Sequence, residues 1–102
     1  MQIAQVRGTV VSTHKLQSMT GVKLLLVQFI DEQGELLPKY EVAADIVGAG
    51  INEWVLVSRG SAARIESRYE QRPLDATVVG IIDTVSVDNR SLYSKRETER
   101  FA

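Results

Sequence analysis

The sequence predicts an all-β protein whose strands close into one small barrel. Short segments rich in apolar and β-branched residues follow one another along the chain, and almost no stretch has helical periodicity. Glycine, proline, asparagine and aspartate separate about five main segments, as expected of turns between strands. A single small sheet usually closes into a barrel, because closure removes its exposed edges. A five-stranded OB-like barrel with short helical turns is therefore the expected architecture.

Composition narrows the classes of function. The chain has 102 residues, enough for one domain, and is 44% hydrophobic and 25% charged. Twelve basic and thirteen acidic residues leave a net charge of −1, whereas a nucleic-acid-binding domain is usually basic. Cysteine is absent, which excludes disulfides and fits a reducing compartment. With no signal-peptide pattern and no run of roughly 20 apolar residues, we expect a soluble cytoplasmic protein without a membrane partner.

The first two expected strands differ in their patterns. Residues 2–12 alternate between apolar and polar, and Gly8 in their middle predicts a bulge or sharp bend. Residues 23–30 are apolar on both faces, so both faces need cover. Two explanations remain open for the outer face of this second strand. Either loops of the same chain cover it, or it packs against another copy.

Turn residues separate the next strands. Residues 31–35 predict a hairpin turn with Gly34 at a position of positive φ. Pro38 predicts that the following strand begins at an edge or at this residue. Residues 39–44 alternate, and Asp45 then opens a glycine turn to Gly50, where it is a candidate N-cap for one helical turn.

The second half of the chain completes the barrel. Residues 51–59 and 76–87 each predict a strand that is apolar on both faces, and residues 65–72 form a charged, exposed loop. Residues 88–91 are a turn before a short return strand. We expect one β-barrel domain over residues 1–94 and a charged, flexible tail over 95–102. Three strands with two apolar faces predict an oligomer on physical grounds alone.

The residues do not assemble into a recognisable catalytic or metal site. His14 is the only histidine and lies in a polar segment, so neither a zinc site nor a Ser-His-Asp triad has its usual components. The aspartates beside strands fit turns and caps better than a carboxylate pair. We expect no enzyme, cofactor or metal. The alternative function is an OB-type module for single-stranded nucleic acid, which would need aromatic platforms in a basic groove. The cluster of arginines between 59 and 72 is interleaved with Glu66 and Glu70, which favours a solvated loop.

Five segments, in order along the chain, carry a resemblance to a known family: 20–27 (TGVKLLLV), 45–50 (DIVGAG), 53–57 (EWVLV), 60–64 (GSAAR) and 79–83 (VGIID). They resemble the CcmL/EutN family of pentameric vertex proteins of bacterial microcompartments. The resemblance runs from about residue 3 to residue 93. Segments 52–57 and 72–76 are most similar to the carboxysome members. One departure is Asn52, which stands where many relatives have glycine.

The resemblance implies a barrel that assembles as a cyclic homopentamer with a structural role. Such pentamers form the vertices of the icosahedral carboxysome shell, which encloses RuBisCO and carbonic anhydrase for carbon dioxide fixation. The implied partners are hexameric carboxysome shell proteins, with inner scaffold proteins as further candidates. The implied location is the shell itself, in the cytoplasm.

A cyclic ring uses two different patches on each subunit, and small residues allow backbones to crowd near its axis. We therefore expect the loop of Gly60, Ser61, Ala62 and Ala63 to approach the five-fold axis and line a narrow pore, with Ser61 the most exposed. We expect the glycine turn to pack beneath that loop and Arg64 to pair either across the interface or with a neighbouring carboxylate. The residues of this supporting set are Gly48, Ala49, Gly50, Glu53 and Arg64.

Overall fold

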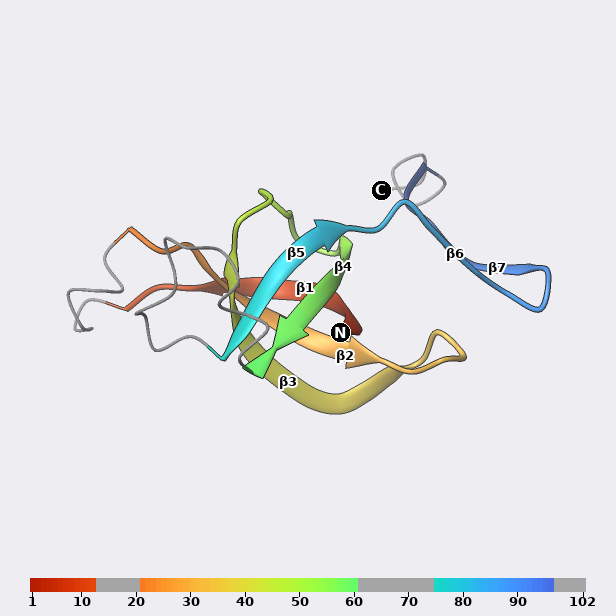
Figure 1. Cartoon of the computed structure of the whole chain (residues 1–102), viewed down its shortest axis with the longest axis horizontal. Coiled ribbons are helices and arrows are strands. Elements are labelled where there is room, and N and C mark those ends of the chain that lie inside the picture. The colour runs from red at the N-terminus through yellow and green to blue at the C-terminus, as the bar shows by residue number, and fades with distance from the viewer. Residues whose placement is uncertain (13–20, 61–74, 97–102) are drawn as a thin grey trace.

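Five strands form a closed barrel, with neighbours in the order β1-β2-β3-β5-β4 (Figure 1). This computed structural model describes residues 1–12, 21–60 and 75–96. Its strands are β1 (Gln2–Val10), β2 (Leu24–Ile30), β3 (Leu36–Asp45), β4 (Trp54–Arg59), β5 (Ala76–Ile81), β6 (Thr84–Val87) and β7 (Arg90–Ser94). Neighbouring barrel strands are antiparallel, except that β3 and β5 are parallel. The predicted all-β, OB-like barrel of five strands is confirmed. The expectations for His14, for the loop at 65–72 and for the end of the tail lie outside the described residues.

The inward faces of the strands fill the barrel with apolar side chains. Alternate residues of β1, β2 and β4 point inward, as the alternation of β1 predicted. Burying one valine, leucine or phenylalanine side chain contributes about 1.5–3 kcal/mol, so this layer is the main source of stability. The most buried members of the core are Ala4, Val6, Leu25, Val27, Phe29, Ala43, Val55, Val57, Ala76 and Val78.

Two of the predicted turn features have clear backbone causes. The register of β1 against β2 shifts between Val6 and Gly8, which confirms the bulge expected at Gly8. Gly34 has a φ of 83°, as expected for the glycine of the β2–β3 hairpin. Asn52 has a φ of 70°. Asparagine is among the non-glycine residues that adopt this left-handed conformation most readily, so Asn52 fits a position where the resemblance leads one to expect glycine.

In β3, whose residues alternate between apolar and polar, apolar side chains point out of the barrel. Tyr40 and Val42 are 54% and 47% exposed, while Lys39 and Glu41 share the inward parity of the core residue Ala43. The Lys39 Nζ lies 5.3 Å from the centre of the Phe29 ring, and Arg59 Nη2 lies 3.4 Å from Glu41 Oε2. Charged side chains therefore occupy inward positions at the barrel mouth, where an aromatic ring and an ion pair compensate them.

Pro38 lies at the third position of β3, in a part of the strand that pairs with β2 alone. Its missing N–H therefore faces an edge, and the predicted edge position is correct, although two residues precede the proline. The helical turn expected after Asp45 is absent. Residues 46–50 instead bend around Gly48, whose φ of 78° is incompatible with a right-handed helix.

The single strand expected over residues 76–87 is wrong. β5 leaves the barrel after Ile81, and the N–H of Ile82 donates to the Trp54 carbonyl at 2.8 Å. β6 then pairs with β7 in a separate hairpin, which projects beside the barrel in Figure 1. Asp88 and Asn89 at its tip both have positive φ, as a two-residue hairpin turn requires. The unbroken apolar sequence at 78–82 concealed this change of sheet.

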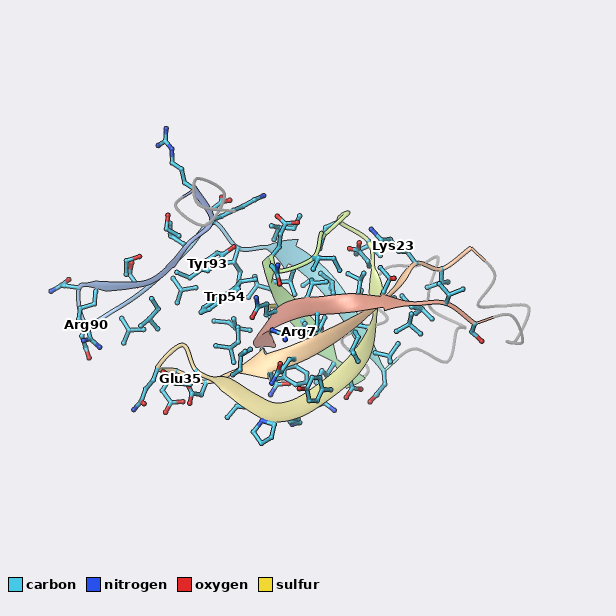
Figure 2. All side chains as sticks on the ribbon, turned by 180° about the vertical axis from the view of Figure 1, so that it is seen from behind. Arg7, Lys23, Glu35, Trp54, Arg90 and Tyr93 are labelled. Atoms are coloured by element: carbon cyan, nitrogen blue, oxygen red, sulfur yellow. The ribbon has the colours of Figure 1, made fainter. Side chains whose placement is uncertain are left out.

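One aromatic pair attaches the hairpin to the barrel. The rings of Trp54 in β4 and Tyr93 in β7 stack with centroids 4.4 Å apart and planes 13° from parallel. Figure 2 shows these two side chains between the hairpin and the barrel. Leu92 packs beside Gly34, where an added Cβ would lie 3.7 Å from Leu92 Cβ. The hairpin is therefore held at a fixed place on the outside of the barrel.

Candidate functional site

The candidate site consists of β4 and the two turns that flank it. The first turn depends on Asp45, whose side chain is fully buried at 0% exposure. Its Oδ1 accepts the N–H groups of Val47 and Gly48, at 3.0 and 3.1 Å, and its Oδ2 accepts that of Ala49 at 3.0 Å. Lys23 Nζ lies 3.2 Å from the same Oδ2. The carboxylate thus accepts three backbone N–H groups of the turn that follows it, as aspartate does in Asx-type turns.

Glu53 connects the end of this turn at Gly50 to Lys95, near the last described residue. Ala49 is buried in the barrel core, and the N–H of Gly50 donates to Glu53 Oε1 at 2.6 Å. Glu53 Oε2 lies 2.8 Å from Lys95 Nζ. The hydrogen bond from Lys95 and the N–H of Gly50 lower the pKa of Glu53, against the opposing effects of burial and of the Asp45 charge. Glu53 therefore links the glycine turn to the segment that follows the hairpin.

The second turn begins at Gly60, where β4 ends. Gly60 has a φ of 65°, and its N–H donates to the Asp75 carbonyl at 2.8 Å. Ser61, Ala62, Ala63 and Arg64 lie outside the described residues. Gly48 and Gly50 precede β4 whereas Gly60 follows it, so the two turns lie at opposite ends of this strand. Packing of the glycine turn beneath the Gly60 loop remains a prediction.

Within the described parts of the chain, Asp31 and Asp45 both accept backbone N–H groups. Asp31 Oδ1 accepts the N–H groups of Gln33 and Glu35, both at 2.9 Å, and Asp45 holds its own turn. Residues 1–12, 21–60 and 75–96 contain no group of three histidine, cysteine or acidic residues placed to hold a metal. In these same ranges no helix is long and apolar enough to cross a membrane.

Most aromatic side chains of the described residues already pack against another side chain. Trp54 and Tyr93 stack on each other, and Phe29 is buried beneath Lys39 and Arg59. Of these described aromatics, Tyr40 alone presents a largely exposed ring. Binding of single-stranded nucleic acid uses several neighbouring aromatic platforms for successive bases. The described strands do not provide such a row.

Comparisons with known proteins agree with this geometry. The family described as "Ethanolamine utilisation protein EutN/carboxysome" matches residues 1–83. The chain is 68% identical to the carboxysome shell vertex protein CcmL of Gloeobacter violaceus, over 98% of this chain and all of the relative.

The chain belongs to the EutN/CcmL family.

Solved structures extend the likeness to three dimensions. The structure of Gloeobacter violaceus CcmL has a TM-score of 0.91 at 70% identity, covering 94% of this chain and 99% of that one. The pentameric microcompartment shell protein GrpN of Rhodospirillum rubrum has a TM-score of 0.78 at 45% identity, covering 87% of this chain and all of the other. These names describe structural proteins of this EutN/CcmL family. The expectation of a structural shell protein rather than an enzyme is confirmed at the level of the family.

Some features of this EutN/CcmL chain were not found from its sequence. The N-cap interpretation of Asp45 anticipated that its side chain accepts nearby N–H groups, although these groups belong to a bend and not to a helix. The glycines three and five positions after this aspartate are the signal for a bend, because Asx-type turns have this composition. The ion pair of Glu53 with Lys95 had no signal in the sequence. The outward orientation of Tyr40 had no local signal.

We expect Asp45→Asn to destabilise the protein by about 3 kcal/mol, because the amide offers one acceptor where a charged carboxylate received three N–H groups. Lys23 would also lose its ion-pair partner. Urea unfolding at a fixed protein concentration measures the change. The matched control is Asp31→Asn in the solvent-facing hairpin turn, for which about 1 kcal/mol is expected. Equal losses for the two variants would contradict the role given to burial of Asp45.

We expect Glu53→Gln to cost less than about 1 kcal/mol at neutral pH, since the ion pair with Lys95 is partly exposed. Because folding lowers the pKa of Glu53, the wild-type advantage is complete above the ordinary value of 4.5 and is lost as the pH falls through the lowered value. Unfolding curves at about pH 7 and about pH 3 should therefore converge for the two proteins only in acid. Glu32→Gln, in an exposed turn, is the control that should change nothing at neutral pH.

Proposed function

We propose that this chain forms the vertices of a carboxysome shell as a cyclic homopentamer. The observation that carries the proposal is the match over nearly the whole chain to proteins named carboxysome shell vertex proteins. Solved members of the same fold are named pentameric shell proteins. The role is structural, and the chain works in the shell, inside the cytoplasm.

The surface of a single barrel supports assembly. Leu36, Tyr40 and Val42 of β3 are 42%, 54% and 47% exposed. Exposed apolar side chains that gather on one sheet face commonly mark a protein interface. The sequence left open whether loops or another copy cover the outer face of the strand at 23–30, and no residue of β2 is exposed in one copy. The apolar residues that stay exposed belong instead to the neighbouring strand β3, and they offer a surface for a second copy.

The partners of the ring follow from its place in the shell. A pentamer at a vertex meets hexameric carboxysome shell proteins along its outer edges, and its inner side faces scaffold proteins. The closed shell encloses RuBisCO and carbonic anhydrase and retains carbon dioxide near them. These contacts rest on the family resemblance.

The loop that begins at Gly60 is proposed to line the five-fold axis. Gly60 adopts a positive φ that other residues rarely take, so the chain turns sharply as it leaves β4. Ser61, Ala62 and Ala63 carry small side chains that permit close approach of five backbones. Arg64 would then pair with a neighbouring subunit.

Native mass spectrometry tests the assembly. We expect one dominant species of five times the 11.3 kDa chain mass, free of nucleic acid. Co-expression with hexameric shell proteins should give closed icosahedral shells in electron micrographs, and omission of this chain should leave open or elongated ones. A monomer that retains an oligonucleotide would instead support the alternative function of an OB-type binding module.

The axial position of Ser61 has a test of its own, helped by the lack of cysteine. We expect mild oxidation of a Ser61→Cys variant to link subunits within one pentamer, because five copies of the residue converge. The control Val11→Cys places a thiol at an exposed position, 87% accessible, and should give no such links. Links for Ser61→Cys only between separate pentamers would place this residue on the outer rim.

A further inference from the structure

One outer face of the barrel is convex and apolar. It consists of Leu26, Leu36, Tyr40 and Val42, which we call the β3 face. Leu26 pairs with Val42 across β2 and β3, so the side chains adjoin. Tyr40 is the most exposed of the described aromatic side chains at this surface. An exposed tyrosine flanked by aliphatic residues is a common anchor at protein interfaces.

A second apolar surface is concave. Where the outer sides of β1 and β4 meet the beginning of β6, the chain forms an open groove of about 450 Å³, which we call the hairpin groove. Ile3 and Leu56 are paired across β1 and β4 and form its floor, and Val85 of the projecting hairpin contributes to its wall. The stacked pair of Trp54 and Tyr93 fixes the hairpin that builds this wall.

The two surfaces lie on different sides of the barrel. In the strand order β1-β2-β3-β5-β4, the β3 face belongs to β2 and β3. The hairpin groove is lined by residues of β1, β4, the end of β5 at Ile81, the link to β6 and the start of β6, and by none of β2 or β3. One chain cannot place its own β3 face in its own groove.

A cyclic ring needs two different complementary patches on each subunit, whereas a two-fold dimer pairs one patch with itself. A convex face and a concave groove, both apolar and pointing in different directions, meet this requirement. Two convex β3 faces placed against each other would bury little area and would stop at two copies.

We propose that the β3 face of one subunit seats in the hairpin groove of the next, so that the β6–β7 hairpin is the arm that holds each neighbour in the ring. This inference rests on the proposed pentamer and specifies its interface. Tyr40 and Val42 are the anchors, and Ile3, Leu56 and Val85 receive them.

Cross-linking tests the contact. The doubly substituted chain V42C/T84C carries one thiol on the β3 face and one at the rim of the groove. A short thiol-reactive cross-linker should join its subunits into a ladder of up to five chains on a denaturing gel. Each single variant, and the control pair V42C/T9C, should remain as single chains. A normal pentamer mass without the ladder would overturn the interface while leaving the proposed function intact; a wild-type protein that is not pentameric would contradict the proposed function itself.

A mixing experiment distinguishes a head-to-tail ring from other arrangements. Tyr40→Asp should disable the β3 face, and Val85→Asp should disable the groove. Each variant alone should therefore no longer show the mass of a pentamer. Circular dichroism reports whether each remains folded, and Ile3→Asp replaces Val85→Asp if that variant unfolds. Mixed in equal amounts, the two folded variants retain one intact interface between them and should form heterodimers that grow no further. Full pentamers from either variant alone, or no heterodimer from the mixture, would overturn the inference.

Discussion

Closure of the barrel depends on a very short parallel contact between β3 and β5. Its two residue pairs are Ala44 with Thr77 and Asp45 with Val78. The N–H of Asp45 also donates to the Lys23 carbonyl at 2.9 Å, while its carboxylate receives the amides of the following turn. One residue therefore joins the seam of the barrel to the turn that delivers the chain into β4. Weakening it affects the sheet and the turn together.

The parts of the fold that could be predicted are those set by local sequence. Alternation in β1, the bulge at Gly8 and the hairpin at Gly34 each follow from side-chain period or from the freedom of glycine. The number of strands followed from the spacing of turns. The five matching segments then gave the family, which the comparisons confirm.

The parts that could not be predicted depend on contacts between distant segments. Alternation shows that Tyr40 and Lys39 lie on opposite faces of β3 but not which face is inside. The answer depends on Phe29 and Arg59 at the barrel mouth. The Phe29 ring lies beneath Lys39, and Arg59 forms an ion pair with Glu41. The break between β5 and β6 likewise comes after a last bond from Ile82 to Trp54 of β4, and the stack of Trp54 on Tyr93 then holds the separate hairpin. Asp83 lies at the bend, but one aspartate does not show that the chain changes sheet there.

The filled interior of the barrel also has a consequence for permeability. Ala4, Val27, Val55, Val57 and Val78 are completely buried at its centre, and the side chain of Phe29 with its two cations closes one mouth. A subunit with such an interior has no lumen, and interiors packed to this density exclude solutes. A metabolite that crosses a vertex must therefore diffuse between subunits. Selectivity is then a property of the contacts between subunits and not of the residues that fill each barrel.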